Sequence, residues 1–346
     1  MRSAALPLLA VGLCPVMSIA ANYSAQKAVV DGVEVVRLAD AASHAEVAIV
    51  PSLGNLAYEF KVNGKNVFWL PYRTLAEMKA KPQFGGVPFL APWANRLSGD
   101  AFFANGVKFR LNPDLGNIGR DQNQNPIHGL LTFSADWKVT ALASDADSAS
   151  VTSRLEFWKH PEMMAQFPFA HTIEMTFRLH EGVLEVRTEI ENLSADAMPV
   201  GIGYHPYFQI HDAPRDQWKV HLAARDHLGL SKMMIPTGER KPMEFADPLP
   251  LAGVALDDVF GSLVRDASRA TFWVEGAHEK ISVIYGPKYT VAVVYAPAGR
   301  QFICFEPMSA ITDGFNLAHA GVYKELQSIP PGDTWRESFW IAPSGF

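Results

Sequence analysis

Hydrophobic and polar residues alternate along much of this chain with the two-residue period of β-strands. The clearest example is the pair of segments 172–179 and 183–190, which are joined by His180-Glu181-Gly182. In each segment one face is mainly apolar and the opposite face is mainly polar or charged. Because successive side chains of a strand point to opposite faces, this pattern predicts two strands, each with one face buried.

Similar segments predict further strands along the rest of the chain. Asn63-Gly64 and Asn105-Gly106 each separate two of them, and Asn-Gly strongly favours a tight hairpin turn. The further predicted strands are 45–50, 58–62, 66–70, 101–104, 107–111, 137–143, 150–158, 217–222, 270–274, 280–285, 290–295, 302–305 and 334–341.

Helical periodicity is nearly absent, and the one predicted helix is a short segment at 74–80 that ends before Pro82. Many strands without alternating helices predict an all-β fold, with antiparallel sheets packed face to face or closed into a barrel. The length of 346 residues fits a large antiparallel β-sandwich best. No linker, repeat or low-complexity tract divides the chain, so we expect residues 21–346 to form a single domain.

The first residues have the features of a secretory signal peptide. Arg2 precedes an apolar run at 4–19, and Ser18 and Ala20 supply the small residues that signal peptidase prefers. The run is short for a bilayer span, so an uncleaved anchor is the weaker alternative. We therefore expect residues 1–20 to be removed and the protein to be exported, to a periplasm or to the cell exterior. Cys304 would then be the only cysteine, which excludes an intramolecular disulfide.

The charge balance narrows the class of partner. The chain has 30 Lys and Arg and 36 Asp and Glu, a net charge of −6, without a basic run that could offset it. This balance argues against nucleic acid or an anionic membrane surface as a partner. We expect a monomer or a weak homodimer.

His205 is the first candidate for chemistry. It lies in an aromatic segment, 201–208, and Pro206 favours an extended backbone at the histidine, as at a strand end or in a loop. The neighbouring Tyr207 could supply a flat apolar wall of the kind on which a sugar ring stacks. The alternative is a packed histidine that is hydrogen-bonded to the backbone.

Glu306 is the second candidate. It closes an apolar strand between Phe305 and Pro307, where desolvation would raise the pKa of a half-buried carboxyl group toward neutrality. The alternative is a strand-end glutamate paired with an arginine.

Other kinds of site find less support. His211, His221 and His227 are the densest group of histidines, but their spacing matches no common set of metal ligands, and we expect no metal. A Gly-x-Ser-x-Gly nucleophile motif is absent from the sequence, and Cys304 lies in an apolar strand where a thiol is normally unreactive.

Five segments together resemble the aldose 1-epimerase (galactose mutarotase) family in their order and approximate separation. They are Gly85 to Arg96 with its Ala-Asn-Arg ending, Ile127-His128-Gly129, His205-Pro206-Tyr207-Phe208, Leu256-Asp257-Asp258-Val259-Phe260 and Phe305-Glu306-Pro307. The resemblance covers nearly the whole chain after the leader. It implies the family fold, a large antiparallel β-sandwich, which agrees with the strand pattern.

The resemblance also implies the roles of the two candidates. Glu306 matches the family's general base, which removes the proton of the anomeric hydroxyl, and His205 matches the general acid, which protonates the ring oxygen. Opening a cyclic hemiacetal needs one proton removed and one delivered, so a carboxylate and an imidazolium suffice. No redox cofactor, phosphate donor or metal is implied.

The same resemblance implies a set of substrate-binding residues. Those that match residues bonding to sugar hydroxyls are Arg96, His128 and Asp257, with Asn95 and Tyr207 expected beside them. Asp258 is the alternative to its neighbour Asp257.

The expected activity is interconversion of the α and β anomers of a free aldose, such as glucose or galactose. The segments 84–88 and 91–93 also resemble the hexose-6-phosphate branch of the superfamily, but the Ala-Asn-Arg ending and the predicted export favour free sugars. Two other classes remain open: a non-catalytic carbohydrate-binding protein, and a hydrolase or lyase that uses Asp257 as a second carboxyl group.

Overall fold

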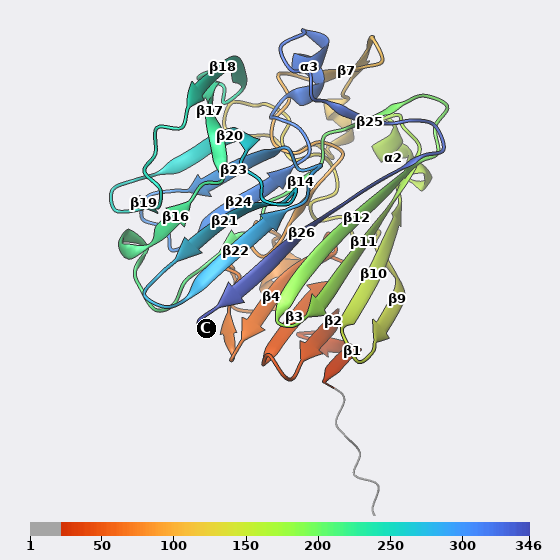
Figure 1. The fold of residues 1–346 in the computed structure, drawn as a ribbon. Helices are drawn as coiled ribbons and strands as arrows, with labels where there is room; N and C mark the ends of the chain where they lie inside the picture. The colour runs from red at the N-terminus through yellow and green to blue at the C-terminus, as the bar shows by residue number, and fades with distance from the viewer. Residues whose placement is uncertain (1–21) are drawn as a thin grey trace, which may run out of the picture.

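The structure, a computed structural model, describes residues 22–346, so the predicted leader lies outside the described residues. Residues 22–346 fold into a five-stranded, a nine-stranded and an eight-stranded sheet, with two further two-stranded sheets (Figure 1). Among residues 22–346, no helix has the length and hydrophobicity needed to cross a membrane.

The five-stranded sheet follows the chain order. Its strands are β1 (Tyr23–Val30), β2 (Val33–Asp40), β3 (Ala45–Val50), β4 (Leu56–Val62) and β5 (Lys65–Asn66). Asn63 and Gly64 turn between β4 and β5 with φ angles of 49° and 81°. Two successive positive φ angles are what a tight Asn-Gly hairpin requires, so this predicted turn is confirmed.

The nine-stranded sheet forms the largest layer. In spatial order its strands are β19 (Leu249–Pro250), β16 (Lys219–His221), β21 (Ala270–Glu275), β22 (Lys280–Tyr285), β26 (Thr334–Ser344), β12 (Val183–Asn192), β11 (His171–His180), β10 (Ala149–Glu156) and β9 (Lys138–Ser144). All its neighbouring strands are antiparallel.

The eight-stranded sheet carries the residues of interest. Its main path is β18 (Pro236–Pro242), β17 (Ala224–Leu230), β20 (Leu256–Leu263), β23 (Val291–Ala296), β24 (Ile303–Met308), β14 (Gly203–Tyr204) and β6 (Phe89–Leu90). The eighth strand, β15 (Tyr207–Phe208), also pairs with β24.

Short elements complete the fold. The two-stranded sheets are β7 (Ala101–Ala104) with β8 (Val107–Arg110) and β13 (Met198–Val200) with β25 (Gln327–Ile329). The helices are α1 (Leu75–Ala80), α2 (Pro161–Met164) and α3 (Gly314–His319), with 3-10 turns at Pro113–Leu115, Phe157–Lys159 and Arg215–Gln217.

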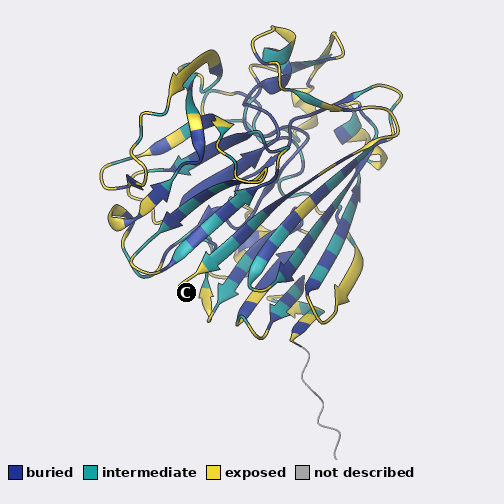
Figure 2. Cartoon of the chain, viewed as in Figure 1, coloured by how far each residue is buried: buried dark blue, intermediate teal, exposed yellow. Residues whose placement is uncertain are grey.

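The three large sheets share one hydrophobic core. The nine-stranded sheet contacts the five-stranded sheet where β9, β10 and β11 lie against β1 and β2. It faces the eight-stranded sheet through ring contacts such as Tyr204 with Phe339, whose centroids are 4.8 Å apart, and Phe272 with Phe305 at 6.1 Å. Figure 2 shows buried residues along the strands of both layers and exposed residues mainly at the turns. The predicted all-β sandwich is confirmed.

The predicted pair 172–179 and 183–190 appears as β11 and β12, with Ile173 opposite Ile190. Other predictions were incomplete. The predicted strand 66–70 is mostly wrong. The strand β5 that pairs with β4 ends at Asn66, and Phe68 bridges to Phe208 instead. Of the longer strands, the sequence also missed β1, β2, β17, β18 and β20. In β18, exposed polar residues dominate and hide the strand period.

Candidate active site

Backbone pairing brings His205 and Glu306 together. His205 lies between β14 and β15, and both of these short strands pair with β24, which carries Glu306. Gly203 faces Met308, and a Cβ at Gly203 would lie 3.0 Å from the Pro307 carbonyl oxygen, a tight contact, so glycine favours this close approach. As a result His205 Nε2 lies 3.3 Å from Glu306 Oε1.

A second pair of loops positions Asn95, Arg96 and His128. Arg96 bridges to Ile127, and the His128 N–H donates to the Asn95 carbonyl at 2.9 Å. Asn95 and His128 have left-handed backbones, with φ angles of 56° and 63°. Gly129 follows, and a Cβ there would lie 2.2 Å from the Ala91 carbonyl oxygen. The turn at His128 therefore depends on glycine at the next position.

Strand register brings Asp257 to the same place. Asp257 on β20 lies opposite Tyr295 on β23, and Tyr295 lies opposite Cys304 on β24. Glu306, two residues beyond Cys304, shares its face of the sheet. Asp258 points elsewhere, because its Oδ1 is 2.8 Å from His227 Nε2. Asp257, and not its neighbour, therefore faces Glu306.

These groups line one cavity of about 330 Å³. Its lining residues are Asn95, Arg96, Asp121, Gln122, Ile127, His128, His205, Asp257, Tyr295 and Glu306. The structure thus gathers every predicted site residue except Tyr207. Asp121, Gln122 and Tyr295 were not predicted from the sequence, because their positions depend on contacts between segments far apart in the chain.

Tyr207 has a different position from the one predicted. It is buried and does not line the cavity; its ring stacks on the His205 imidazole, with centroids 4.7 Å apart and planes at 6°. Phe84, which is partly exposed, lies 5.5 Å from the same imidazole. Tyr207 therefore packs against the histidine and does not form part of the cavity wall.

Burial favours the uncharged forms of both Glu306 and His205. Burial raises the pKa of Glu306 well above its usual value, and the Asp257 charge adds to this, while Arg96 opposes it. Burial lowers the pKa of His205 to about 3, and Arg96 adds to this. Glu306 Oε2 and His205 Nδ1 are buried without a partner among the described residues, so the pair is not fully satisfied within the fold.

Asp257 and His128, which line the same cavity, differ in their surroundings. Partial burial raises the pKa of the Asp257 carboxyl group and Arg96 opposes this, although the residue as a whole remains exposed to solvent. Burial lowers the pKa of His128, and the charges of His205 and Arg96 add to this. His128 is therefore a neutral hydrogen-bonding group.

The three histidines of the densest sequence group lie apart from this cavity. His211 Nε2 is 2.8 Å from the Asn66 carbonyl oxygen, and His221 Nδ1 is 2.6 Å from an Asp247 carboxylate oxygen. Within residues 22–346 no three His, Cys, Asp or Glu side chains cluster as metal ligands.

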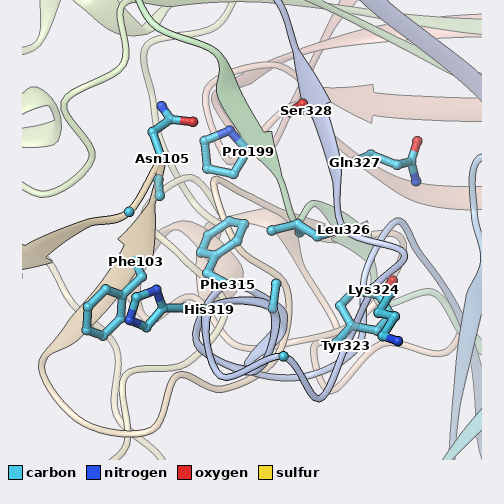
Figure 3. Close-up of a pocket in the computed structure, with 14 residues that line it drawn as sticks. Phe103, Asn105, Pro199, Phe315, His319, Tyr323, Lys324, Leu326, Gln327 and Ser328 are labelled. Carbon is cyan, nitrogen blue, oxygen red and sulfur yellow. The ribbon is translucent and has the colours of Figure 1, made fainter.

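A larger cavity, of about 450 Å³, lies between α3, β7 and β25 (Figure 3). None of its lining residues is an aspartate or glutamate. Its histidine, His319, is stacked on Phe103 with centroids 3.7 Å apart, and Gln327 donates to the carbonyls of Lys288 and Ser309. This cavity lacks an acid and base pair, so the smaller cavity is the candidate active site.

Comparison with known proteins agrees with this geometry. The family model for aldose 1-epimerase matches residues 35–342. The Escherichia coli K12 protein YihR is 25% identical over 233 residues, which span 66% of this chain and 70% of that protein. YphB of the same organism is 24% identical over 259 residues, which span 71% and 79% of the two chains.

Solved structures share the fold. A galactose mutarotase-like protein from Clostridium acetobutylicum superposes with a TM-score of 0.82 at 20% identity, covering 94% of this chain and 99% of that one. A galactose 1-epimerase from Lactobacillus acidophilus superposes with a TM-score of 0.69 at 13% identity, covering 94% and 99%.

Proposed function

The chain belongs to the aldose 1-epimerase family, and from this we propose that it interconverts the α and β anomers of a free aldose by opening and reclosing the pyranose ring. The observation that carries the proposal is the distance of 3.3 Å between His205 Nε2 and Glu306 Oε1 in a cavity open to solvent. A base and an acid at this separation can serve two oxygens that are bonded to the same carbon.

The reaction transfers two protons. Glu306, as carboxylate, takes the proton of the anomeric hydroxyl, and His205, as imidazolium, gives a proton to the ring oxygen as its bond to the anomeric carbon breaks. The aldehyde then rotates, and reclosure on the opposite face reverses both transfers. Each positioned proton transfer accelerates the reaction by roughly 10² to 10⁴.

The pair need not take up a proton from solvent. In the free protein the raised pKa of Glu306 and the lowered pKa of His205 favour a protonated carboxyl group beside a neutral imidazole. That state holds one proton, as does the reactive carboxylate and imidazolium. Binding of the sugar therefore has only to shift the proton across the 3.3 Å between the two groups.

The charges of the cavity favour an uncharged sugar. Arg96 is the only lysine or arginine among its lining residues, and its Nε–H already donates to Asp121 Oδ2 at 2.6 Å. Asp257 adds a further carboxyl group. A phosphate group is best bound by cations that are free to form bidentate bonds, so free hexoses fit this lining better than hexose phosphates.

The decisive experiment is polarimetry of freshly dissolved α-glucose and α-galactose with Glu306→Gln. The variant should lose catalysis but keep its fold and its sugar binding, measured by circular dichroism and calorimetry. Glu174→Gln, which changes a surface glutamate paired with Arg154 on β10, is the control and should retain full activity. Sugar binding by the unchanged protein without mutarotation would instead identify a carbohydrate-binding protein.

A further inference from the structure

Arg96 is held by two neighbours in the cavity wall. Its Nε–H donates to Asp121 Oδ2 at 2.6 Å, and its Nη1–H donates to Asn95 Oδ1 at 2.9 Å. The Arg96 and Asp121 side chains are only 13% and 4% exposed, so solvent screens this ion pair little. Nη2 has no partner among the described residues and remains available to a ligand.

Asp121 is fixed by its own turn. Its Oδ1 accepts the backbone N–H groups of Asn123 and Asn125, both at 2.9 Å, and the same turn places Gln122 in the cavity wall. Burial alone would raise the pKa of Asp121, but the bonds from Arg96, Asn125 and Asn123 lower it, so the carboxyl group stays ionised. One oxygen thus anchors the turn, and the other anchors the guanidinium.

This arrangement uses the positive charge of Arg96 before a substrate arrives. The Asp121 carboxylate offsets that charge, and Asp257 faces the same cavity. A sugar hydroxyl can still accept a bond from Nη2, because that bond needs a donor and not a net charge. A phosphate would find no uncompensated cation in the wall and would lie near two carboxyl groups.

We propose that Asp121 is a positioning residue that determines specificity: it orients Arg96 toward sugar hydroxyls and offsets its charge, so that the cavity selects uncharged sugars over sugar phosphates. The inference rests on the proposed mutarotase function. It assigns Asp121 no contact with the reacting atoms.

Asp121→Asn separates the two tasks of this side chain. The asparagine carbonyl can keep accepting the bonds of the turn, while its NH2 group then faces the Arg96 Nε–H, donor against donor. A charge-assisted hydrogen bond is worth about 1.5 to 3 kcal/mol, so we expect KM for the free hexose to rise about tenfold or more. We expect kcat to change by less than about threefold, because the proton transfers of Glu306 and His205 are untouched.

The same variant should gain affinity for anions, which loss of structure would not produce. Inorganic phosphate and glucose 6-phosphate should inhibit Asp121→Asn at concentrations about tenfold lower than they inhibit the unchanged protein, since the charge of Arg96 is no longer offset by a carboxylate. Asp121→Asn combined with Arg96→Gln should lose this gain. Asp100→Asn removes the exposed carboxylate that pairs with Arg120, and it should change neither KM nor inhibition.

Thermal unfolding checks that the variants fold. If Asp121→Asn does not fold, Asp121→Ser replaces it, because serine keeps an acceptor for the turn. A folded variant with unchanged KM and unchanged phosphate inhibition overturns the role of Asp121. If the unchanged protein shows no mutarotation, the proposed function fails. Calorimetry of glucose and phosphate binding would then still test whether Asp121 determines which of the two ligands the cavity binds.

Discussion

Two buried histidines of this protein have opposite surroundings. His171 lies in β11, stacks on Phe157 with centroids 4.2 Å apart, and its Nδ1 is 2.7 Å from the Phe169 carbonyl oxygen. His205 also stacks on an aromatic ring, that of Tyr207, but its Nδ1 has no partner among the described residues and its Nε2 faces Glu306. His171 is thus hydrogen-bonded within the fold, whereas His205 lines a cavity and lies beside a carboxyl group.

The sharpest way to separate the two histidines is to replace each by glutamine. His205→Gln should lower kcat for mutarotation by roughly 10² to 10⁴, because the proposed general acid is removed, and should leave the fold intact. His171→Gln should leave kcat per folded molecule unchanged and lower stability. Polarimetry together with urea unfolding measures both effects. Equal activity losses in the two variants would contradict the proposed difference between His205 and His171.

The backbone around the two histidines differs as well. β11 is regular, whereas the loop beside His205 depends on Gly129, which has a φ of 67° and no room for a Cβ. Gly129→Ala should destabilise the protein by about 2 to 4 kcal/mol through strain and steric overlap. Gly106→Ala is the matched control, because Gly106 has a φ of 76° but nothing within 4 Å of a Cβ. It should cost only about 1 kcal/mol in urea unfolding.

Acid should destabilise the protein through His171, the histidine that is hydrogen-bonded within the fold. Burial lowers the pKa of His171 from 6.5 to about 4 in the folded protein. As the pH falls from about 6.5 toward 4, the unfolded chain therefore binds a proton that the folded chain does not, and stability decreases. For this residue the loss between pH 7 and pH 5 is about 2 kcal/mol. His171→Phe should remove that part of the pH dependence, and urea unfolding at both pH values measures it.

The smallest expected effect concerns the stacked rings. Tyr207→Leu should lower kcat about three- to tenfold, since an aromatic pair worth about 0.5 to 1.5 kcal/mol no longer orients the imidazole. Tyr207→Phe keeps the ring and should be close to the unchanged protein. Phe157→Leu removes the ring that packs on His171, and it should change stability only. A catalytic loss in the Phe157 variant, measured by polarimetry, would be evidence against this distinction.

The sequence predicted the elements whose pattern is local. β11 and β12 follow from their own alternation, and the turn at Asn63-Gly64 follows from its own backbone preference. It predicted His205 and Glu306 as a pair through their motifs, and the structure places them 3.3 Å apart.

Contacts between distant segments could not be predicted in this way. Asp121 meets Arg96 only because two loops lie together, and Tyr295 faces the cavity only because of its register opposite Asp257. Tyr207 was predicted to touch the sugar because it is close to His205 in the chain, but the short strand β15 turns its ring beneath the imidazole. The sequence identifies which residue types are present, and packing decides which atoms they meet.

Because β14 and β15 pair with the same strand, β24, the element that spaces His205 and Glu306 is separate from the turn that forms part of the cavity wall. The spacing of His205 and Glu306 is fixed by backbone hydrogen bonds of a sheet, whereas the turn with Asp121 and Gln122 belongs to none of the large sheets. The length or the charges of that turn can therefore be changed, to redesign the cavity wall, while the spacing of His205 and Glu306 is left as it is.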